Sequence, residues 1–453
     1  MQLVKKKKGF TIVEALVLLF IFSLITMTFY SVMSLGGSYI IESKNHLAAV
    51  ALANEKMEII RNLPYDSVGI VGGIPNGNLP AEEDVTTGGK SFHVKNFVQY
   101  VDDPFDGTSP TDLDYKRVKV TISWKGVRGA TSNVSLITRF VPPGIEQNVS
   151  GGTLSINVMG SNGVGVPQAS VHITNANVSP AVNLTAMTDD SGNLMLPGAK
   201  PSTQTYNIHV SKSGYETVDT IDPATVTYSV IDKPASVVDG MMNPVSIIED
   251  KIANLKIDAV DYLDSPLANT SFHFAGGRVF GYDMLYSPAA PQYNLIVDKT
   301  TDATGEVNFS DISPGPYSIS AIIPPVGYTL IEPDKFSAFD KSKSIYSLIE
   351  AAGNTETVKV RFANNNSNSL LLNVVKDADG TPIVGATVTL TSASGYNNSQ
   401  ITSIDGVVFF PTGSEVFVAG DYNINVTAPN YLDNTSAVTI NKLTKTQIKM
   451  VTN

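Results

Sequence analysis

The chain has 453 residues, no cysteine, and 42 acidic against 31 basic residues, which gives a formal net charge of −11. At about 150 residues per domain this length predicts about three folded units, and the lack of cysteine excludes disulfides, thiolate catalysis and cysteine-ligated metal centres. The acidic balance provides no general basic field, so nucleic acid is not an expected partner.

The first 35 residues form a basic and then strongly apolar segment. Residues 5–8 are four lysines, Gly9 follows them, and residues 10–35 are an apolar run of 26 residues with Glu14 as its one formal charge. Because about 20 apolar residues span a bilayer, the run predicts a transmembrane helix, and the lysines place its N-terminus in the cytoplasm. A cleaved secretory signal would have a shorter apolar core and a small-residue cleavage site. A plain signal anchor accounts for the length but not for Glu14, because a carboxylate in hydrocarbon is costly without a partner.

Residues 8–14 closely resemble the processing site of type IV prepilins and pseudopilins, where a Gly, a Phe and a Glu at the fifth mature position precede a long apolar helix. The resemblance implies a leader peptide of residues 1–9, cleavage between Gly9 and Phe10 by a prepilin peptidase, and methylation of the Phe10 amine. It also implies that Glu14 neutralises the N-terminal amine of a neighbouring pilin subunit when the helices pack in a filament. The protein would lie in the cytoplasmic membrane before assembly and on an extracellular filament or the cell surface afterwards.

We expect the helix to continue beyond the membrane and to form a stem of residues 10–63, about 80 Å long at the usual helical rise. Gly36 and Gly37 interrupt the apolar run and would provide a flexible point. After them an amphipathic pattern predicts a buried helical face, and Pro64 ends it. The apolar residues at helical spacing are Leu47, Val50, Met57 and Ile60.

Past Pro64 the pattern changes to the period of two that is typical of strands. Residues 91–101, 115–124 and 131–140 are rich in β-formers, and a short turn joins the last two segments. Together with the stem they predict an α+β unit, residues 64–150, that resembles the small globular domain of minor pilins. The acidic loop 102–107 is a candidate calcium loop, but it lacks the spaced ligands and closing Glu of such loops, so a solvated turn is expected.

Residues 151–453 contain three copies of one pattern, each about 90–110 residues long. In each copy a strand, an acidic glycine turn (188–192, 301–305 or 402–406) and an alternating strand ending near a tyrosine follow in this order. This predicts three tandem immunoglobulin-like or prealbumin-like β-sandwiches at 151–250, 251–363 and 370–453, so the chain is all-β after its α+β N-terminal unit. The alternating positions expected in the cores are Ala169, Val171, Ile173, Tyr206, Ile208 and Val210, then Thr270, Phe272, Phe274, Tyr317, Ile319 and Ala321, then Ala386, Val388, Leu390, Tyr422, Ile424 and Val426.

The three copies resemble the carboxypeptidase-regulatory-like and Cna-B-like families of surface domains. Some Cna-B-like domains join a Lys to an Asn through an isopeptide bond, with a buried acid four residues after the tyrosine of the penultimate strand. Here Val210, Ala321 and Val426 occupy that position, so we do not expect self-crosslinking, because an apolar residue cannot move the proton that amide formation requires. The regulatory-like resemblance implies a structural role and no enzyme.

The five histidines do not form a recognisable catalytic or metal-binding pattern. His172 and His273 occupy equivalent positions in two copies, each between apolar strand residues, so we expect them on the solvated face. His46, His93 and His209 have no acid or second histidine at metal-ligand spacing. The sequence also contains no nucleophile elbow, HExxH motif or Walker loop, so no catalytic residue, metal or cofactor is expected.

Taken together, the sequence predicts a non-enzymatic, minor type IV pilin-like subunit that displays three sandwiches as a stalk or for adhesion. Three added domains would crowd a filament if every subunit carried them, so a tip or low-copy position is expected. Two alternatives stay open: a pseudopilin of a type II secretion system, and an uncleaved surface protein held by one transmembrane helix. The ligand, protein or glycan, is not specified, because most aromatic residues lie at alternating strand positions that favour core packing.

Overall fold

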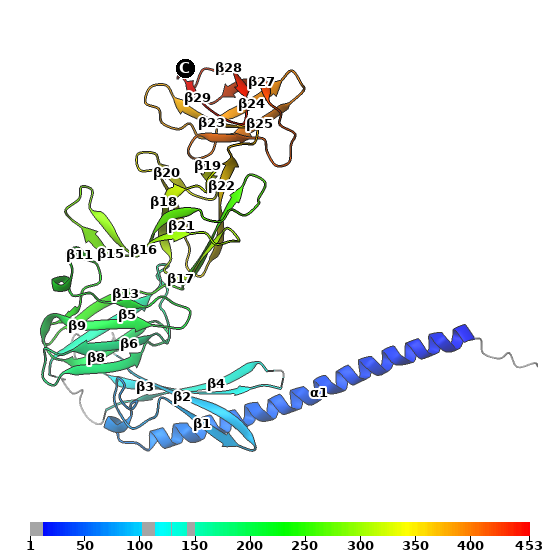
Figure 1. The fold of residues 1–453 in the computed structure, drawn as a ribbon. Helices are drawn as coiled ribbons and strands as arrows, with labels where there is room; N and C mark the ends of the chain where they lie inside the picture. Colours follow the sequence, from blue (N-terminus) through cyan, green and yellow to red (C-terminus); the bar gives the residue numbers. More distant parts are fainter. Residues whose placement is uncertain (1–11, 102–113, 128, 143–149) are drawn as a thin grey trace, which may run out of the picture.

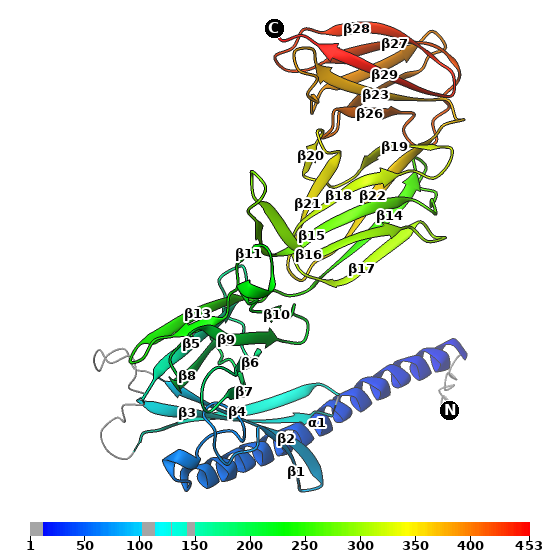
Figure 2. The same ribbon diagram turned by 60° about the vertical axis from the view of Figure 1, so that its left-hand side comes forward.

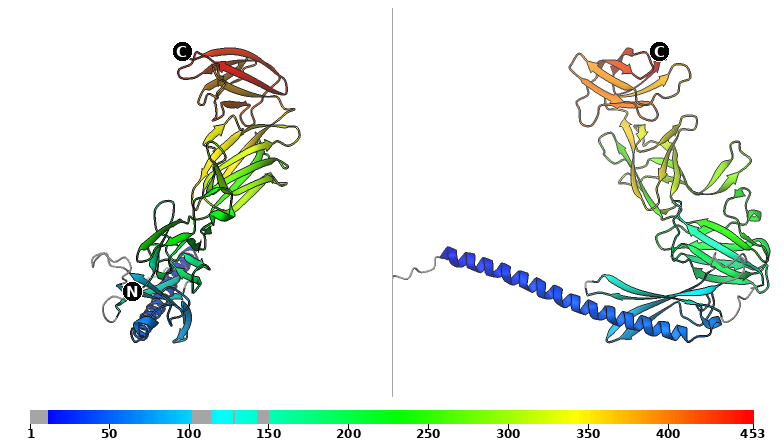
Figure 3. Two further views of the ribbon diagram at one scale, coloured as in Figure 1. Left: turned by 90° about the vertical axis from the view of Figure 1, so that its left-hand side faces the viewer. Right: turned by 180° about the vertical axis from the view of Figure 1, so that it is seen from behind.

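The computed structural model describes residues 12–101, 114–127, 129–142 and 150–453. Gly9, Phe10 and the acidic loop 102–107 lie outside these residues. The chain consists of one long N-terminal helix, α1 (Ile12–Arg61), followed by β-sheets throughout. The sheets form four groups one after another, with the C-terminus at the end farthest from α1 (Figures 1 and 2). The right-hand view of Figure 3 shows that the N-terminal half of α1 projects beyond the sheets.

Helix α1 is continuous for 50 residues and passes through Gly36 and Gly37 without interruption, so the expected flexible point is wrong. Five of its serine and threonine hydroxyls donate to backbone carbonyls three or four residues earlier, as Thr26 does to Phe22 O at 2.7 Å, and so need no outside partner. Of the predicted buried face, Met57 and Ile60 are buried, whereas Leu47 is 69% exposed and was wrongly placed. Ala49 and Ala53 let the helix approach the sheet closely, and the buried residues of α1 are Asn45, Ala49, Leu52, Ala53, Met57 and Ile60.

The first group, here called the head sheet, packs against the C-terminal half of α1. Its four antiparallel strands lie in chain order: β1 (Glu82–Thr87), β2 (Lys90–Val101), β3 (Tyr115–Lys125) and β4 (Thr131–Phe140). The three predicted strands are confirmed, whereas β1 was not predicted because its acidic, exposed sequence has no apolar alternation. Side chains from the sheet face that α1 covers are fully buried: Phe92, Val94, Val118, Val120 and Ile122.

The second group, the proximal group, spans residues 152–248 and places one hydrophobic cluster between two sheets. One sheet has the order β10-β9-β6-β7, with β12 paired to β9, and the other has the order β13-β5-β8. The elements are β5 (Gly152–Met159), β6 (Ser170–Asn175), β7 (Val182–Met187), β8 (Asn193–Ala199), β9 (Ser202–Ser211), β10 (Val218–Asp219), β11 (Ser229–Val230), β12 (Ala235–Val237) and β13 (Met242–Ile248).

The middle group, residues 253–364, and the distal group, residues 369–450, each also hold a hydrophobic cluster between two sheets. The middle strands are β14 (Ala253–Asp261), β15 (Ser271–Asp283), β16 (Ala290–Thr300), β17 (Glu306–Ile312), β18 (Gly315–Ile323), β19 (Tyr328–Pro333), β20 (Ala338–Asp340), β21 (Ile345–Glu350) and β22 (Thr355–Asn364). The distal strands are β23 (Ser369–Lys376), β24 (Thr387–Ser392), β25 (Asn397–Ile401), β26 (Val407–Phe410), β27 (Gly420–Thr427), β28 (Asn434–Ile440) and β29 (Leu443–Met450).

The three groups share one strand arrangement, which is consistent with β-sandwich repeats. In each, the first strand pairs in parallel with the last one, as β5 with β13, β14 with β22 and β23 with β29. The strand that follows pairs antiparallel with the tyrosine strand, as β6 with β9, β15 with β18 and β24 with β27.

The acidic glycine turns are also built alike in the three groups. A buried threonine opens each turn, and its hydroxyl donates to a backbone carbonyl while it accepts a backbone N–H, which ties the turn to a neighbouring loop. A glycine closes each turn with a positive φ of 75–82°, a conformation that side chains other than glycine disfavour. The threonines are Thr188, Thr301 and Thr402, and the glycines are Gly192, Gly305 and Gly406.

The predicted core positions are buried with one exception, Ala321, which is exposed. Strand β18 carries an extra residue here, because Ser320 pairs with His273 and Ile323 pairs with Ser271. Such a bulge inverts the alternation of side chains beyond it, and Ala321 adopts a φ of 47°. The placement of Ala321 in the core was therefore wrong.

Candidate functional site

The N-terminal half of α1 is the most distinctive surface of the molecule. Among the described residues, α1 is the helix long and apolar enough to cross a membrane, and its most apolar window is not buried at all. Glu14 lies in the first described turn, where the helix dipole favours a carboxylate. Gly9 and Phe10 lie outside the described residues, so the processing site stays a prediction.

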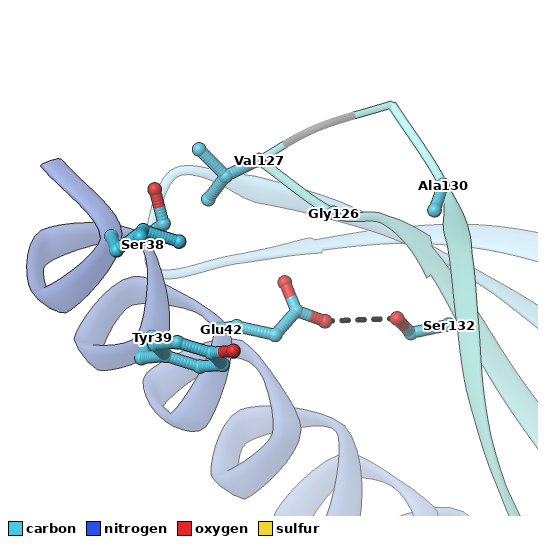
Figure 4. A pocket seen from close by; sticks show the side chains of 8 residues that line it. Ser38, Tyr39, Glu42, Gly126, Val127, Ala130 and Ser132 are labelled. Carbon is cyan, nitrogen blue, oxygen red and sulfur yellow. Dashed lines mark hydrogen bonds between the residues drawn. The ribbon is translucent and has the colours of Figure 1, made fainter. Parts of the chain in front are cut away.

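The helix is joined to the head sheet by a carboxylate at its midpoint, Glu42. Glu42 Oε1 accepts a hydrogen bond from Trp124 Nε1 at 3.0 Å. The same oxygen accepts a second bond from Ser132 Oγ at 2.9 Å, which Figure 4 shows. Trp124 is only 4% exposed, and its ring packs edge-on to those of Phe92 and His46, with centroids 6.1 Å apart in both pairs. A buried indole normally satisfies its N–H, so Glu42 fixes where the helix meets the β3–β4 hairpin.

Beside this contact lies a cavity of about 230 Å³ between α1 and the turn of the β3–β4 hairpin. Its walls are mainly apolar, and among the described residues that line it Glu42 is the one with a formal charge. The other residues that line it are Leu35, Ser38, Tyr39, Gly126, Val127, Ala130 and Ser132.

A buried lysine holds the chain between α1 and the head sheet. Lys116 is 2% exposed, and its Nζ donates to the carbonyls of Tyr65 at 2.9 Å and Val68 at 2.8 Å. The ammonium also lies 4.5 Å from the Tyr65 ring centroid, a cation–π contact. Burial lowers the pKa of Lys116, so its hydrogen bonds to carbonyls offset the cost of desolvation.

The acidic turn of the proximal group docks on the head sheet. Asp189 Oδ1 accepts the backbone N–H of Ser191 and of Asn193 at 2.8 Å, which is the geometry of an Asx turn. Its other oxygen accepts from Gln99 Nε2 at 3.3 Å, and Lys119 Nζ lies 2.9 Å from Asp190. Ile74 and Tyr100 of the head region also pack against the proximal cluster. The sequence showed the turn but not this docking.

Arg278 clamps the middle group to the proximal group. It follows a bulge in β15 at Gly277, whose φ of 82° redirects the strand toward the proximal group. Arg278 Nη1 donates to Glu216 Oε1 at 3.0 Å and to Ile248 O at 2.8 Å, while Nη2 donates to Asp232 Oδ2 at 2.8 Å. Pairing of β11 with β15 reinforces the same junction.

A buried carboxyl, Glu249, lies next to this clamp. It is fully buried, and neither of its carboxylate oxygens has a hydrogen-bond partner among the described residues. Burial is the main cause that raises the pKa of Glu249, and the nearby charge of Glu216 acts in the same direction, whereas Lys212 and Arg278 lower it; the net pKa is about 7. Protonation of this group near neutral pH therefore changes the charge inside the junction.

The junction of the middle and distal groups uses the distal acidic turn. Tyr346 donates its hydroxyl to Asp405 Oδ2 at 2.9 Å, and Lys341 Nζ donates to the carbonyl of Gly380. Burial raises the pKa of Glu332 to about 7, with the charge of Asp405 acting in the same direction. Two of the three acidic turns thus contact the group that precedes them.

The histidines lie in surface pairs that sequence spacing did not reveal. His209 Nδ1 lies 2.7 Å from Asp219, and His93 Nδ1 lies 2.9 Å from Asp84. Antiparallel register, not sequence distance, brings these groups together. His172 and His273 lie on the face opposite the core, as predicted, and His172 pairs across strands with His209.

These pairs do not extend into a larger site within the described chain. Among residues 12–101, 114–127, 129–142 and 150–453, no group of three or more His, Asp or Glu side chains could hold a metal ion. Of the positions at which a crosslinking acid would stand, Val210 and Val426 are buried and apolar, whereas Ala321 is exposed. The absence of an isopeptide bond stays a prediction.

Comparison with known proteins gives no family for this chain. No family model and no curated protein matches it. Among solved structures, the Bacillus anthracis TIE protein shares 16% identity over 83% of this chain and 74% of its own, with a TM-score of 0.20. The Streptococcal ancillary pilin shares 13% identity over 67% of this chain and 99% of its own, with a TM-score of 0.20. The major pilin subunit of Bacillus cereus shares 12% identity over 66% of this chain and 99% of its own, with a TM-score of 0.17. TM-scores this low carry no argument about fold or function.

Proposed function

We propose that this chain is a minor type IV pilin-like subunit that is cut after Gly9 by a prepilin peptidase, methylated on Phe10 and incorporated into a surface filament through α1. The observation that carries the proposal is the form of α1. It is one unbroken helix with an exposed apolar half and a half packed on the head sheet, and Glu14 lies at its start. Glu14 would then meet the methylated amine of a neighbouring subunit.

The length of the exposed part favours a filament over a plain membrane anchor. Among the described residues, α1 first hydrogen-bonds the head sheet at Glu42, so residues 12–41 run for about 45 Å ahead of that contact, against about 30 Å of bilayer hydrocarbon. Beyond residue 41, Leu47 is 69% exposed and Ile59 is 51% exposed. A plain anchor leaves these side chains in water, whereas helices of neighbouring subunits would cover them in a filament.

The strand groups after the head sheet would act as a stalk or adhesive module. In this proposal residues 64–150 form the pilin-like domain, and three tandem β-sandwiches occupy 151–250, 251–363 and 370–453. The contacts of Asp189, Arg278 and Tyr346 at successive junctions limit bending between groups. A stiff column of this kind holds the distal group away from the filament axis, where it can meet a surface ligand of protein or glycan.

The test is the N-terminus of the mature protein, read by mass spectrometry from sheared filaments and from membranes. We expect Phe10 as the first residue, carrying one added methyl group, and loss of both processing and filament incorporation in Gly9→Leu. Val164→Leu is a control, because Val164 is 64% exposed in the proximal group and lies outside α1. An unprocessed N-terminus would contradict the proposal and favour the plain anchor. Processed protein that is absent from sheared filaments would favour the secretion pseudopilin.

A further inference from the structure

The cavity between α1 and the β3–β4 hairpin lies at a definable height above the membrane. Residues 15–41 carry no formal charge, a stretch of 27 residues that spans about 40 Å as a helix. That length matches a whole bilayer including its headgroup layers. Glu42 is the first charge after this stretch and one of the residues that line the cavity. If α1 is inserted as proposed above, the cavity opens at the outer headgroup layer.

The head sheet reaches the same height through its hairpin turn. Val127, which is 50% exposed, lines the cavity together with Leu35 of α1, so the turn lies beside the end of the apolar run. Lys90 and Lys125 lie at this end of the sheet, where Lys90 Nζ donates to the Lys125 carbonyl at 2.6 Å. Their ammonium groups complement lipid phosphates, although the chain as a whole is acidic.

The chemistry of the cavity suits a small cation. Glu42 Oε1 is occupied by Trp124 and Ser132, and the second oxygen, Oε2, turns toward Gly126 and the cavity (Figure 4). A Cβ at position 126 would lie 3.1 Å from that oxygen, so the glycine leaves room beside it. Tyr39 contributes an aromatic ring to the same wall. A carboxylate next to an aromatic ring in an apolar pocket recognises an ammonium group.

We propose that this cavity binds the ammonium of a zwitterionic phospholipid headgroup, phosphatidylethanolamine, while the protein resides in the membrane before assembly. The inference rests on the proposed membrane insertion of α1. Three features favour a lipid over a side chain of a neighbouring subunit. The cavity is continuous with the exposed apolar half of α1, it lies at the height of the headgroup layer, and lysines lie at the same end of the sheet. The headgroup seats the head sheet on the bilayer and holds the β3–β4 hairpin at a constant height.

Trp124 allows a direct test, because it is the single tryptophan of the chain. The full-length protein in lipid nanodiscs is measured with a nitroxide placed either on the lipid headgroup or at the end of an acyl chain. We expect the headgroup nitroxide to quench Trp124 fluorescence at least twofold more than the deep one. Val127→Asp should abolish that difference, whereas Val164→Asp, at a 64% exposed position of the proximal group, should preserve it.

Glu42→Gln tests the ammonium contact itself, because the amide oxygen can still accept from Trp124. Native mass spectrometry of the detergent-solubilised full chain should show at least threefold preference for phosphatidylethanolamine over phosphatidylglycerol, and Glu42→Gln should remove it. Equal retention of the two lipids by the unaltered chain would overturn the proposal. Protein that enters nanodiscs but shows no excess headgroup quenching would also overturn it while leaving the membrane anchor intact. Failure to enter nanodiscs would instead contradict the proposed function.

Discussion

Replacing Arg278 by Met should open the junction between the proximal and middle groups. The guanidinium makes three hydrogen bonds of 2.8–3.0 Å, two of them to carboxylates. The side chains of Arg278 and Glu216 are only 12% and 6% exposed, so removal of the cation leaves a carboxylate buried without its counter-charge. Breaking a buried pair in this way costs about 3–5 kcal/mol. We expect about 3 kcal/mol, because Asp232, 18% exposed, can regain water.

Amide hydrogen exchange at the junction measures this loss. The N–H of Ile231 donates to Phe280 O at 3.0 Å across the two groups, so its exchange reports opening of the junction. A loss of about 3 kcal/mol predicts exchange roughly 100-fold faster. Arg361→Met is the matched control, because Arg361 and its partner Asp264 are 30% and 54% exposed and such a pair contributes about 1 kcal/mol or less. If Arg278→Met accelerates exchange no more than this control does, the clamp does not stabilise the junction.

Three further changes test other contacts. The folded pKa of Glu249, about 7, exceeds its ordinary value of 4.5, so the free energy of unfolding should decrease as pH rises from 4.5 to 7. Urea unfolding of Glu249→Gln at several pH values should lack this decrease. Gly192→Ala would place a Cβ 2.2 Å from a facing carbonyl oxygen and should cost more than about 2 kcal/mol of stability. In the control Gly163→Ala the Cβ meets nothing within 4 Å, so only the positive φ should cost about 1 kcal/mol. Equal melting temperatures of the two variants would contradict this. Tyr346→Phe removes the 2.9 Å hydrogen bond to Asp405 and should cost about 1–2 kcal/mol, measured by exchange at the distal junction, with no change as the refuting result.

Periodicity accounts for most of what could be predicted about the fold. A period of two placed β2, β3 and β4 within a residue of their observed bounds, and it identified core residues such as Val171 and Phe274. Prediction was wrong where packing or register decides the outcome. Leu47 fits a helical stripe, yet Ala49 and Ala53 lie against the sheet because small residues allow the closer approach. Ala321 fits the alternation, yet a one-residue bulge turns it outward.

The candidate site divides in the same way. Residues 8–14 resemble a prepilin processing site, and residues 10–35 are long and apolar enough to span a bilayer. Both features are local in sequence, because a membrane helix is specified by length and hydropathy alone. The pairing of Glu42 with Trp124, 82 residues away, and of Arg278 with Glu216, 62 residues away, was not visible in the sequence. Such contacts depend on strand register and on how separate groups meet, and no local period encodes either of these.

The sequence by itself therefore determined the anchor-like helix and the repeated strand pattern. Only the tertiary structure decided which side chains join the helix, the head sheet and the strand groups, because partners that lie far apart in the chain meet only after folding.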